Sequence, residues 1–133
     1  MKAIFADTFY FLAIVSHDDA AHARTVALSS RLTAPIVTTA WVLTETADAL
    51  AVPRQRPIFR TLFDSLRNDV QVNIVSATDT LFEQGIALFN ARPDKSWSLT
   101  DYISFVVMQQ MQLTDALTGD HHFEQAGFRT LLA

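Results

Sequence analysis

Short apolar runs alternate with longer helical patterns along the whole chain, and this alternation limits the fold more than any other feature. Buried strands are predicted at Ala3–Ala6, Ile36–Thr38, Val70–Val75, Ala116–Thr118 and Phe128–Leu131. Helices are predicted over Asp18–Leu32, Ala40–Ala51, a segment that begins near Pro57, Thr78–Asn90 and Leu99–Gln112. Strands that alternate with helices form a parallel sheet, because each connection between parallel strands needs a crossover that covers a face of the sheet. We therefore expect an α/β fold with a central parallel sheet of four to five strands.

Length and composition exclude several classes of protein. The 133 residues suit one domain over 1–133, and 50% of them are hydrophobic, which is enough for a sizeable core. No apolar run approaches the roughly 18 residues that span a bilayer, and the N-terminus lacks the pattern of a signal peptide. The chain has no cysteine, which excludes disulfides, thiolate zinc sites and a cysteine nucleophile. We expect a cytoplasmic protein without membrane contact.

The net charge of −4 argues against a generic basic surface that coats nucleic acid. It leaves room for a nuclease, because the acids can be concentrated in one metal-filled pocket. The chain has only three glycines, Gly85, Gly119 and Gly127. They form neither the G-x-x-x-x-G-K loop nor the G-x-G-x-x-G loop that binds phosphate groups.

Four acidic residues stand in apolar sequence where predicted strands end or helices begin. They are Asp7, Glu45, Asp101 and Asp120. In open α/β sheets, ligands bind beyond the carboxyl ends of the strands, so these carboxylates are expected to converge at one edge. A lone buried carboxylate is costly, whereas several converging ones suit a divalent cation. Mg²⁺ and Mn²⁺ prefer such oxygen ligands, and a bound cation of this kind can promote phosphodiester hydrolysis.

Two hydroxyls neighbour these acids. Thr8 follows Asp7, and Thr100 precedes Asp101. We expect them to orient a water molecule or to support the acidic side chains.

Each acid also has a purely structural interpretation. Ser98 and Asp101 have the spacing of a capping box, Asp7 could cap the next helix, and Asp120 could be a turn residue. Glu45 is the hardest to explain in this way, because no basic residue lies within a helical turn of it. The four acids together therefore favour a functional site more strongly than any one of them does.

Other side chains are weaker candidates. Four of the ten basic residues are candidates for contact with RNA phosphates, namely Arg54, Arg56, Arg60 and Arg67. The last three are expected to share a helical face opposite Phe59 and Phe63, and an ordinary solvated face is the preferred interpretation. We expect Trp97 to pack its loop against the final helix rather than to stack on a base. We expect His121 and His122 to have a structural or turn role rather than to bind zinc.

Three segments of the chain resemble the PIN domain, and in particular the small VapC-type PIN ribonucleases. They are Asp7-Thr8, the stretch Trp97-Ser98-Leu99-Thr100-Asp101, and the stretch Ala116-Leu117-Thr118-Gly119-Asp120-His121-His122-Phe123. The resemblance covers essentially the whole chain. It implies an α/β/α sandwich and an Mg²⁺ or Mn²⁺ ion held by Asp7, Glu45, Asp101 and Asp120. It also implies endonucleolytic cleavage of RNA, often by a homodimer, and in many relatives a toxin that is silenced by an antitoxin peptide in the acidic groove.

The expected function is accordingly a metal-dependent endoribonuclease that acts as the toxin of a toxin–antitoxin pair. The alternative is a non-catalytic PIN module that binds RNA or protein. A dehalogenase-type phosphatase requires a second aspartate two residues after Asp7, where this chain has Phe9. A receiver-type domain requires a lysine after a late strand, and the only lysines are Lys2 and Lys95.

Overall fold

The computed structural model describes all 133 residues, as five strands and seven helices. The strands are β1 (Ile4–Ala6), β2 (Ile36–Thr39), β3 (Val72–Val75), β4 (Asp115–Leu117) and β5 (Arg129–Thr130). The helices are α1 (Thr8–Val15), α2 (His22–Ser29), α3 (Ala40–Ala49), α4 (Arg56–Arg67), α5 (Asp79–Ala91), α6 (Leu99–Gln110) and α7 (His121–Gln125).

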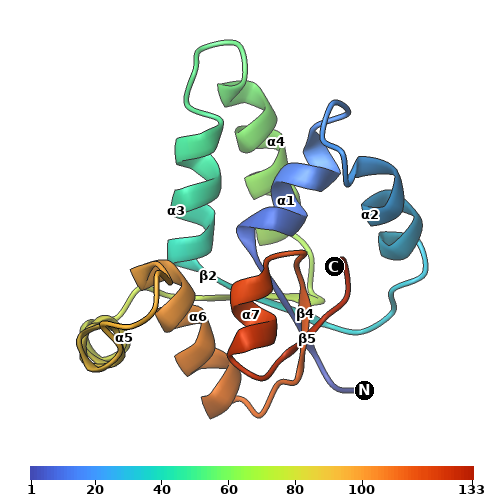
Figure 1. Cartoon of the computed structure of the whole chain (residues 1–133). Coiled ribbons are helices and arrows are strands. Elements are labelled where there is room, and N and C mark those ends of the chain that lie inside the picture. The colour runs from blue at the N-terminus through green and yellow to red at the C-terminus, as the bar shows by residue number, and fades with distance from the viewer.

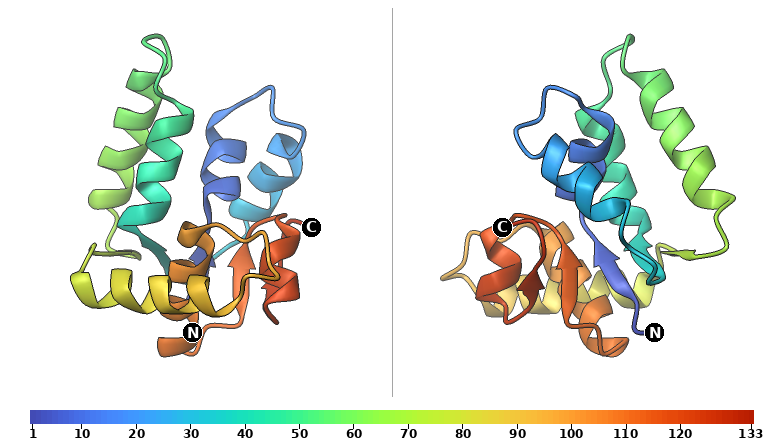
Figure 2. Two further views of the ribbon diagram at one scale, coloured as in Figure 1. Left: turned by 60° about the vertical axis from the view of Figure 1, so that its left-hand side comes forward. Right: turned by 90° about the vertical axis from the view of Figure 1, so that its right-hand side faces the viewer.

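All five strands pair in parallel, in the order β3-β2-β1-β4-β5. The chain therefore moves outward from β1 to β3 and then returns past β1 to form the other half of the sheet. Figures 1 and 2 show the result, with α1 to α4 on one side of the sheet and α5 to α7 on the other. The predicted α/β/α sandwich with a central parallel sheet of four to five strands is confirmed.

The core lies where β1 and α6 meet. All three residues of β1 are buried, and so is the run Asp101–Met108 of α6, as its nearly all-apolar sequence predicts. Helix α5 packs closely on α6 because Gly85 has no side chain, and a Cβ there would collide with Ile103. None of the helices is long and apolar enough to cross a membrane.

Side-chain caps fix the beginnings of four helices, and Asp120 provides the cap of α7. The hydroxyl of Thr39 accepts a hydrogen bond from the Val42 amide at the start of α3, and Thr78 caps α5 in the same way. At the start of α6, Ser98 and Asp101 form the predicted capping box.

Local details differ from the predictions in several places. The predicted helix Asp18–Leu32 begins only at His22, because the Asp19 carboxylate accepts a hydrogen bond from the Ala21 amide and holds a turn there. Helices α1 and α7 are absent from the predicted helices, because the apolar run of α1 shows no helical periodicity and α7 has only five residues. Asp7 stands at the N-cap position of α1, but its side chain forms no capping hydrogen bond. Strand β3 begins at Val72 rather than Val70, which is 95% exposed.

A further difference concerns the arginines of α4. The Arg67 guanidinium lies over the ring of Phe63, 5.1 Å from its centroid, so it borders the aromatic face. The expectation that Arg56, Arg60 and Arg67 lie opposite Phe59 and Phe63 was wrong. Successive residues turn by 100° along a helix, and this places the two sets on adjoining faces rather than on opposite ones.

Candidate metal centre

The pairing of β1 with β4 brings Asp7 next to Thr118. Ala6 lies opposite Leu117 in the sheet, and each strand ends there, so the next residues of both strands are neighbours. The Thr118 hydroxyl donates a hydrogen bond to Asp7 Oδ2 (3.0 Å) and accepts one from the Asp120 amide (3.0 Å). One buried hydroxyl therefore positions both Asp7 and the backbone at Asp120.

The other acids reach the same edge of the sheet from three helices. Glu45 lies on α3, Asp101 lies in the first turn of α6, and Asp120 is the N-cap of α7. All four acids line one cleft of about 440 Å³, together with Thr8, Phe9, Ser96, Ser98 and His122. The structure thus brings together the four acids that the sequence singles out. A larger cavity of about 690 Å³, near α1, α2 and α4, is mainly apolar and has a single carboxylate, Asp69.

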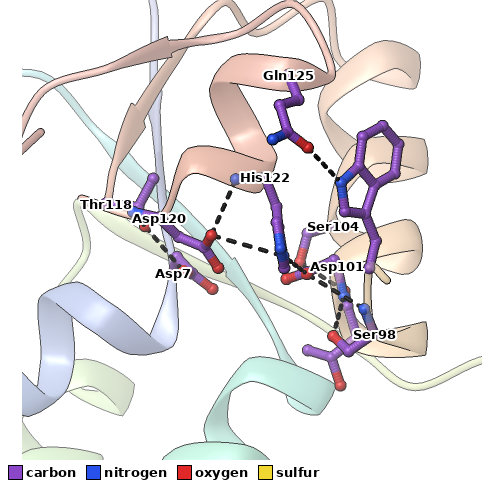
Figure 3. A network of polar contacts seen from close by, with 10 residues as sticks. Asp7, Ser98, Asp101, Ser104, Thr118, Asp120, His122 and Gln125 are labelled. Carbon is purple, nitrogen blue, oxygen red and sulfur yellow. Dashed lines mark hydrogen bonds and ion pairs between the residues drawn. The ribbon is translucent and has the colours of Figure 1, made fainter. Parts of the chain in front are cut away.

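His122 lies between two of the acids, as Figure 3 shows. Its Nδ1 atom is 3.0 Å from Asp101 Oδ2 and 3.5 Å from Asp120 Oδ1. The same Asp101 oxygen accepts the capping hydrogen bond from the Ser98 amide, at 3.3 Å. Asp101 therefore caps α6 and also lines the acidic cleft. The sequence presents these two roles as alternatives, but the structure combines them.

Burial dominates the electrostatics of Asp7. Desolvation raises its pKa from the ordinary 3.8 to about 7, and repulsion from Asp101 and Glu45 acts in the same direction. The hydrogen bond from Thr118 opposes this rise. Near neutral pH, Asp7 is therefore poised between its protonated and ionised forms.

Asp101 is perturbed in the same direction. Burial raises its pKa, and the negative charge of Asp120 adds to the effect. The hydrogen bonds to His122 and Ser98 lower the pKa. These perturbed carboxyls in one cleft are typical of a functional site.

A divalent cation fits this set of donors. No lysine or arginine forms an ion pair with any of the four acids, although Asp94 and Asp115 elsewhere each pair with an arginine. Asp101, Asp120 and His122 each offer one ligand atom, and these atoms lie within 4.8 Å of one another. A cation would supply the positive charge that the protein itself does not provide.

Of the remaining candidate residues, only Thr8 lines the cleft. Its hydroxyl donates to the Val42 carbonyl at 3.4 Å, whereas Thr100 is not among the lining residues. Helix α4 contributes no residue to the cleft, so Arg56, Arg60 and Arg67 lie outside it. Arg54 is exposed in the turn before α4 and also lies outside.

Sequence reasoning missed the places of Thr118 and His122 in this cleft. His122 follows Asp120 by two residues at the start of a helix, and that spacing was the available signal. The prediction for Trp97 is confirmed, because its ring centroid lies 5.4 Å from that of Tyr102 and 5.3 Å from that of Phe105 on α6, the last of the predicted helices. Its indole Nε1 also donates to Gln125 Oε1 (3.0 Å), which ties the loop to α7. For Thr118, only the pairing of β1 with β4 reveals the contact.

Comparison with known proteins agrees with this geometry. The family model of the PIN domain matches residues 4–129. The chain belongs to the PIN domain family. Comparison with curated protein sequences gave no match.

Among the solved structures that resemble this one are those of VapC20 and FitAcB. VapC20 of Mycobacterium tuberculosis, a toxin that cleaves the sarcin–ricin loop, is 26% identical, with a TM-score of 0.85 over 94% of this chain and 95% of that one. FitAcB of Neisseria gonorrhoeae is 17% identical, with a TM-score of 0.64 over 96% of this chain and 95% of that one, and this match shows the fold alone. This PIN protein is thus similar in structure to a VapC toxin over nearly its full length.

Proposed function

We propose that this PIN protein is a metal-dependent endoribonuclease and the toxin of a toxin–antitoxin pair. The observation that carries the proposal is the convergence of Asp7, Glu45, Asp101 and Asp120 in one cleft without a lysine or arginine partner. Membership of the PIN family and the likeness to VapC20 support a nuclease. The proposed cofactor is Mg²⁺ or Mn²⁺.

The residues of the cleft have distinct tasks in this mechanism. Asp7 and Asp101 would hold the cation from the buried side, and the more exposed Glu45 and Asp120 from the open side. Thr118 keeps Asp7 Oδ2 in place, and the Ser98 amide does the same for Asp101. When bound, the cation activates a water molecule and neutralises charge on the scissile phosphate.

The cleft without a cation would repel RNA, because its lining carries four carboxyl groups and no lysine or arginine. A cation held by these carboxylates would offset their charge and so allow a phosphodiester to approach. Thr8 and Thr100 stay candidates for orienting the water. The exposed arginines Arg54, Arg56, Arg60 and Arg67 stay candidates for contacts with phosphates farther along the RNA.

Partners belong to the same proposal. The likeness to VapC20 makes ribosomal RNA the first substrate class to test, since that relative cleaves the sarcin–ricin loop. The proposed antitoxin would present a basic segment, because such a segment complements the acidic cleft. A homodimer and a cytoplasmic location are proposed by similarity to the family.

The direct test is cleavage of labelled total RNA, with ribosomal RNA included, by wild-type protein and Asp7→Asn. Each is incubated with Mg²⁺, with Mn²⁺ or with EDTA. We expect discrete cuts that require a cation and disappear in Asp7→Asn. Asp48→Asn is the matched control, because Asp48 is an exposed acid of α3 outside the cleft.

Absence of cleavage by folded, cation-loaded and antitoxin-free protein would contradict the nuclease. The non-catalytic PIN module would then be the better account. RNA binding without cleavage in the same samples would identify that module directly.

A further inference from the structure

His122 is the one nitrogen donor in a cleft otherwise lined by oxygen donors and Phe9. Its Nδ1 atom faces Asp101 Oδ2 at 3.0 Å and Asp120 Oδ1 at 3.5 Å. An octahedral ion with bonds of about 2.1 Å places adjacent ligands about 3.0 Å apart. The two separations from Nδ1 are therefore close to the spacing that a shared ion requires, and all three ligand atoms lie within 4.8 Å of one another.

Contacts with neighbouring side chains hold the imidazole of His122 in this position. The ring of Trp97 lies 6.4 Å from that of His122, and the Trp97 indole is fixed by its hydrogen bond to Gln125 on the same helix, α7. The His122 amide in turn donates to Asp120 Oδ1 at 2.9 Å, which locks this carboxylate beside the ring. Figure 3 shows the His122 side chain directed toward the acids. These contacts hold the two side chains in place before any ion binds. Metal-binding side chains that are held in this way need no rearrangement when the ion arrives.

The chemistry of the donors then decides which ion is favoured. Carboxylates accept Mg²⁺ and Mn²⁺ alike, whereas imidazole is a ligand for transition ions and a poor one for Mg²⁺, which prefers oxygen. A neutral imidazole with its proton on Nε2 offers the Nδ1 lone pair to an ion. We propose that His122 binds the metal through Nδ1, together with Asp101 and Asp120, and makes this centre prefer Mn²⁺ over Mg²⁺.

This inference rests on the proposed function and names the cation of the same site. The alternative role for His122 is a hydrogen-bond donor that only orients Asp101. In that role no nitrogen touches the ion, and loss of His122 would affect Mg²⁺ and Mn²⁺ binding equally. The two roles therefore differ in an observable that does not depend on RNA cleavage.

The first measurement is electron spin echo envelope modulation of the Mn²⁺-loaded full-length protein. We expect modulation from an imidazole nitrogen in the wild type, altered when the histidines are labelled with ¹⁵N. The labelled wild type keeps the test valid even if a variant fails to fold. The modulation should vanish in His122→Asn and persist in His121→Asn, a matched control because His121 is the exposed neighbour outside the cleft.

The second measurement is calorimetric titration of the same three proteins with Mn²⁺ and with Mg²⁺. We expect His122→Asn to weaken Mn²⁺ binding by roughly tenfold or more, a loss typical of a residue that supports a metal site. Mg²⁺ binding should change by less than about twofold, because the oxygen donors remain. His121→Asn should leave both affinities unchanged.

The outcomes separate this inference from the proposed function. Mn²⁺ binding without nitrogen modulation, or an equal loss for both ions, would overturn the role of His122, while cation-dependent RNA cleavage would still support the nuclease. Failure of wild-type protein to bind either ion would overturn both the role of His122 and the metal centre.

Discussion

The Thr118 hydroxyl donates a hydrogen bond of 3.0 Å to Asp7 Oδ2, although the two residues are 111 positions apart in the chain. Both side chains are buried, and the same hydroxyl oxygen accepts the Asp120 amide. Thr118 therefore couples the acid after β1 to the acid after β4. Loss of this one hydroxyl would therefore alter the positions of both Asp7 and Asp120 in the candidate metal centre.

Replacing Thr118 by valine should destabilise the protein and raise the pKa of Asp7. Thr118→Val leaves the Asp7 carboxylate and the Asp120 amide without their partner, a loss we expect to cost about 1–3 kcal/mol of unfolding free energy. The pKa of Asp7 should rise further, because the lost hydrogen bond lowers it. Urea denaturation and NMR titration of Asp7 measure the two effects.

Thr25→Val is the control for this change. Thr25 is fully buried, and its hydroxyl has no hydrogen-bond partner. The same substitution should therefore be neutral or stabilising there. A comparable loss of stability in both variants would show that the Thr118 hydrogen bonds contribute little.

Replacing Asp7 by asparagine should stabilise the metal-free protein while abolishing cleavage. The side chain is 5% exposed, and its ionisation is opposed mainly by burial. Asp7→Asn removes that charge, so we expect a gain of about 1–3 kcal/mol at pH 8 in EDTA. The exposed Asp48→Asn should change stability by less than about 0.5 kcal/mol. Equal effects of the two variants in urea denaturation would contradict a strained carboxylate at Asp7.

The stability of the metal-free protein should fall as the pH rises from about 4 to about 7. The pKa of Asp7 in the folded protein, about 7, lies above the ordinary 3.8, so the folded state holds the proton more tightly than the unfolded state does. The stabilisation from this proton is complete below pH 4 and is lost as the pH passes 7. Thermal unfolding in EDTA across this range measures the effect, which Asp7→Asn should reduce.

Cation binding should show the opposite dependence on pH. A cation and a proton compete for Asp7, so added Mn²⁺ should raise the melting temperature more at pH 8 than at pH 5. Cleavage should likewise increase toward pH 7 and then level off. A shift in melting temperature that is the same at both pH values would argue against Asp7 as a ligand.

Replacing Arg60 by alanine tests the proposed RNA contact of α4. Arg60 is exposed and forms no ion pair, so Arg60→Ala should leave folding and cation affinity unchanged. The KM for RNA should rise a few-fold and depend less steeply on salt, because one phosphate contact is lost. Arg31→Ala, an exposed arginine after α2, is the comparison. Identical kinetics for the two variants would indicate an ordinary solvated face on α4.

Replacing Gly85 by alanine should destabilise the fold, although the same change usually stabilises a helix. The new Cβ would collide with the Ile103 side chain of α6, and we expect a net loss of about 1–3 kcal/mol. The penalty should disappear in an Ile103→Ala background, where the obstructing atoms are absent. A double-mutant cycle by urea denaturation measures this coupling, and purely additive effects would show that α5 and α6 simply move apart.

Much of the fold was predictable because its signals are local. The apolar run before Asp7 and the buried run of α6 each show in a few consecutive residues that a segment lies inside the protein. The capping box of Ser98 and Asp101 is likewise a short pattern with one geometric meaning. The start of α2 was missed because a single side-chain hydrogen bond at Asp19 favoured a turn over a helix.

The sequence by itself determined the succession of the strands and of five of the seven helices, and the positions of the four acids at their ends. Only the tertiary structure decided that β1 lies between β2 and β4, that Asp7 therefore meets Thr118, and that His122 joins the acids. The physical reason is the range of the interactions. Periodicity and caps depend on neighbours within a few residues, whereas strand order depends on the packing free energy of the whole core, to which residues more than one hundred positions apart contribute.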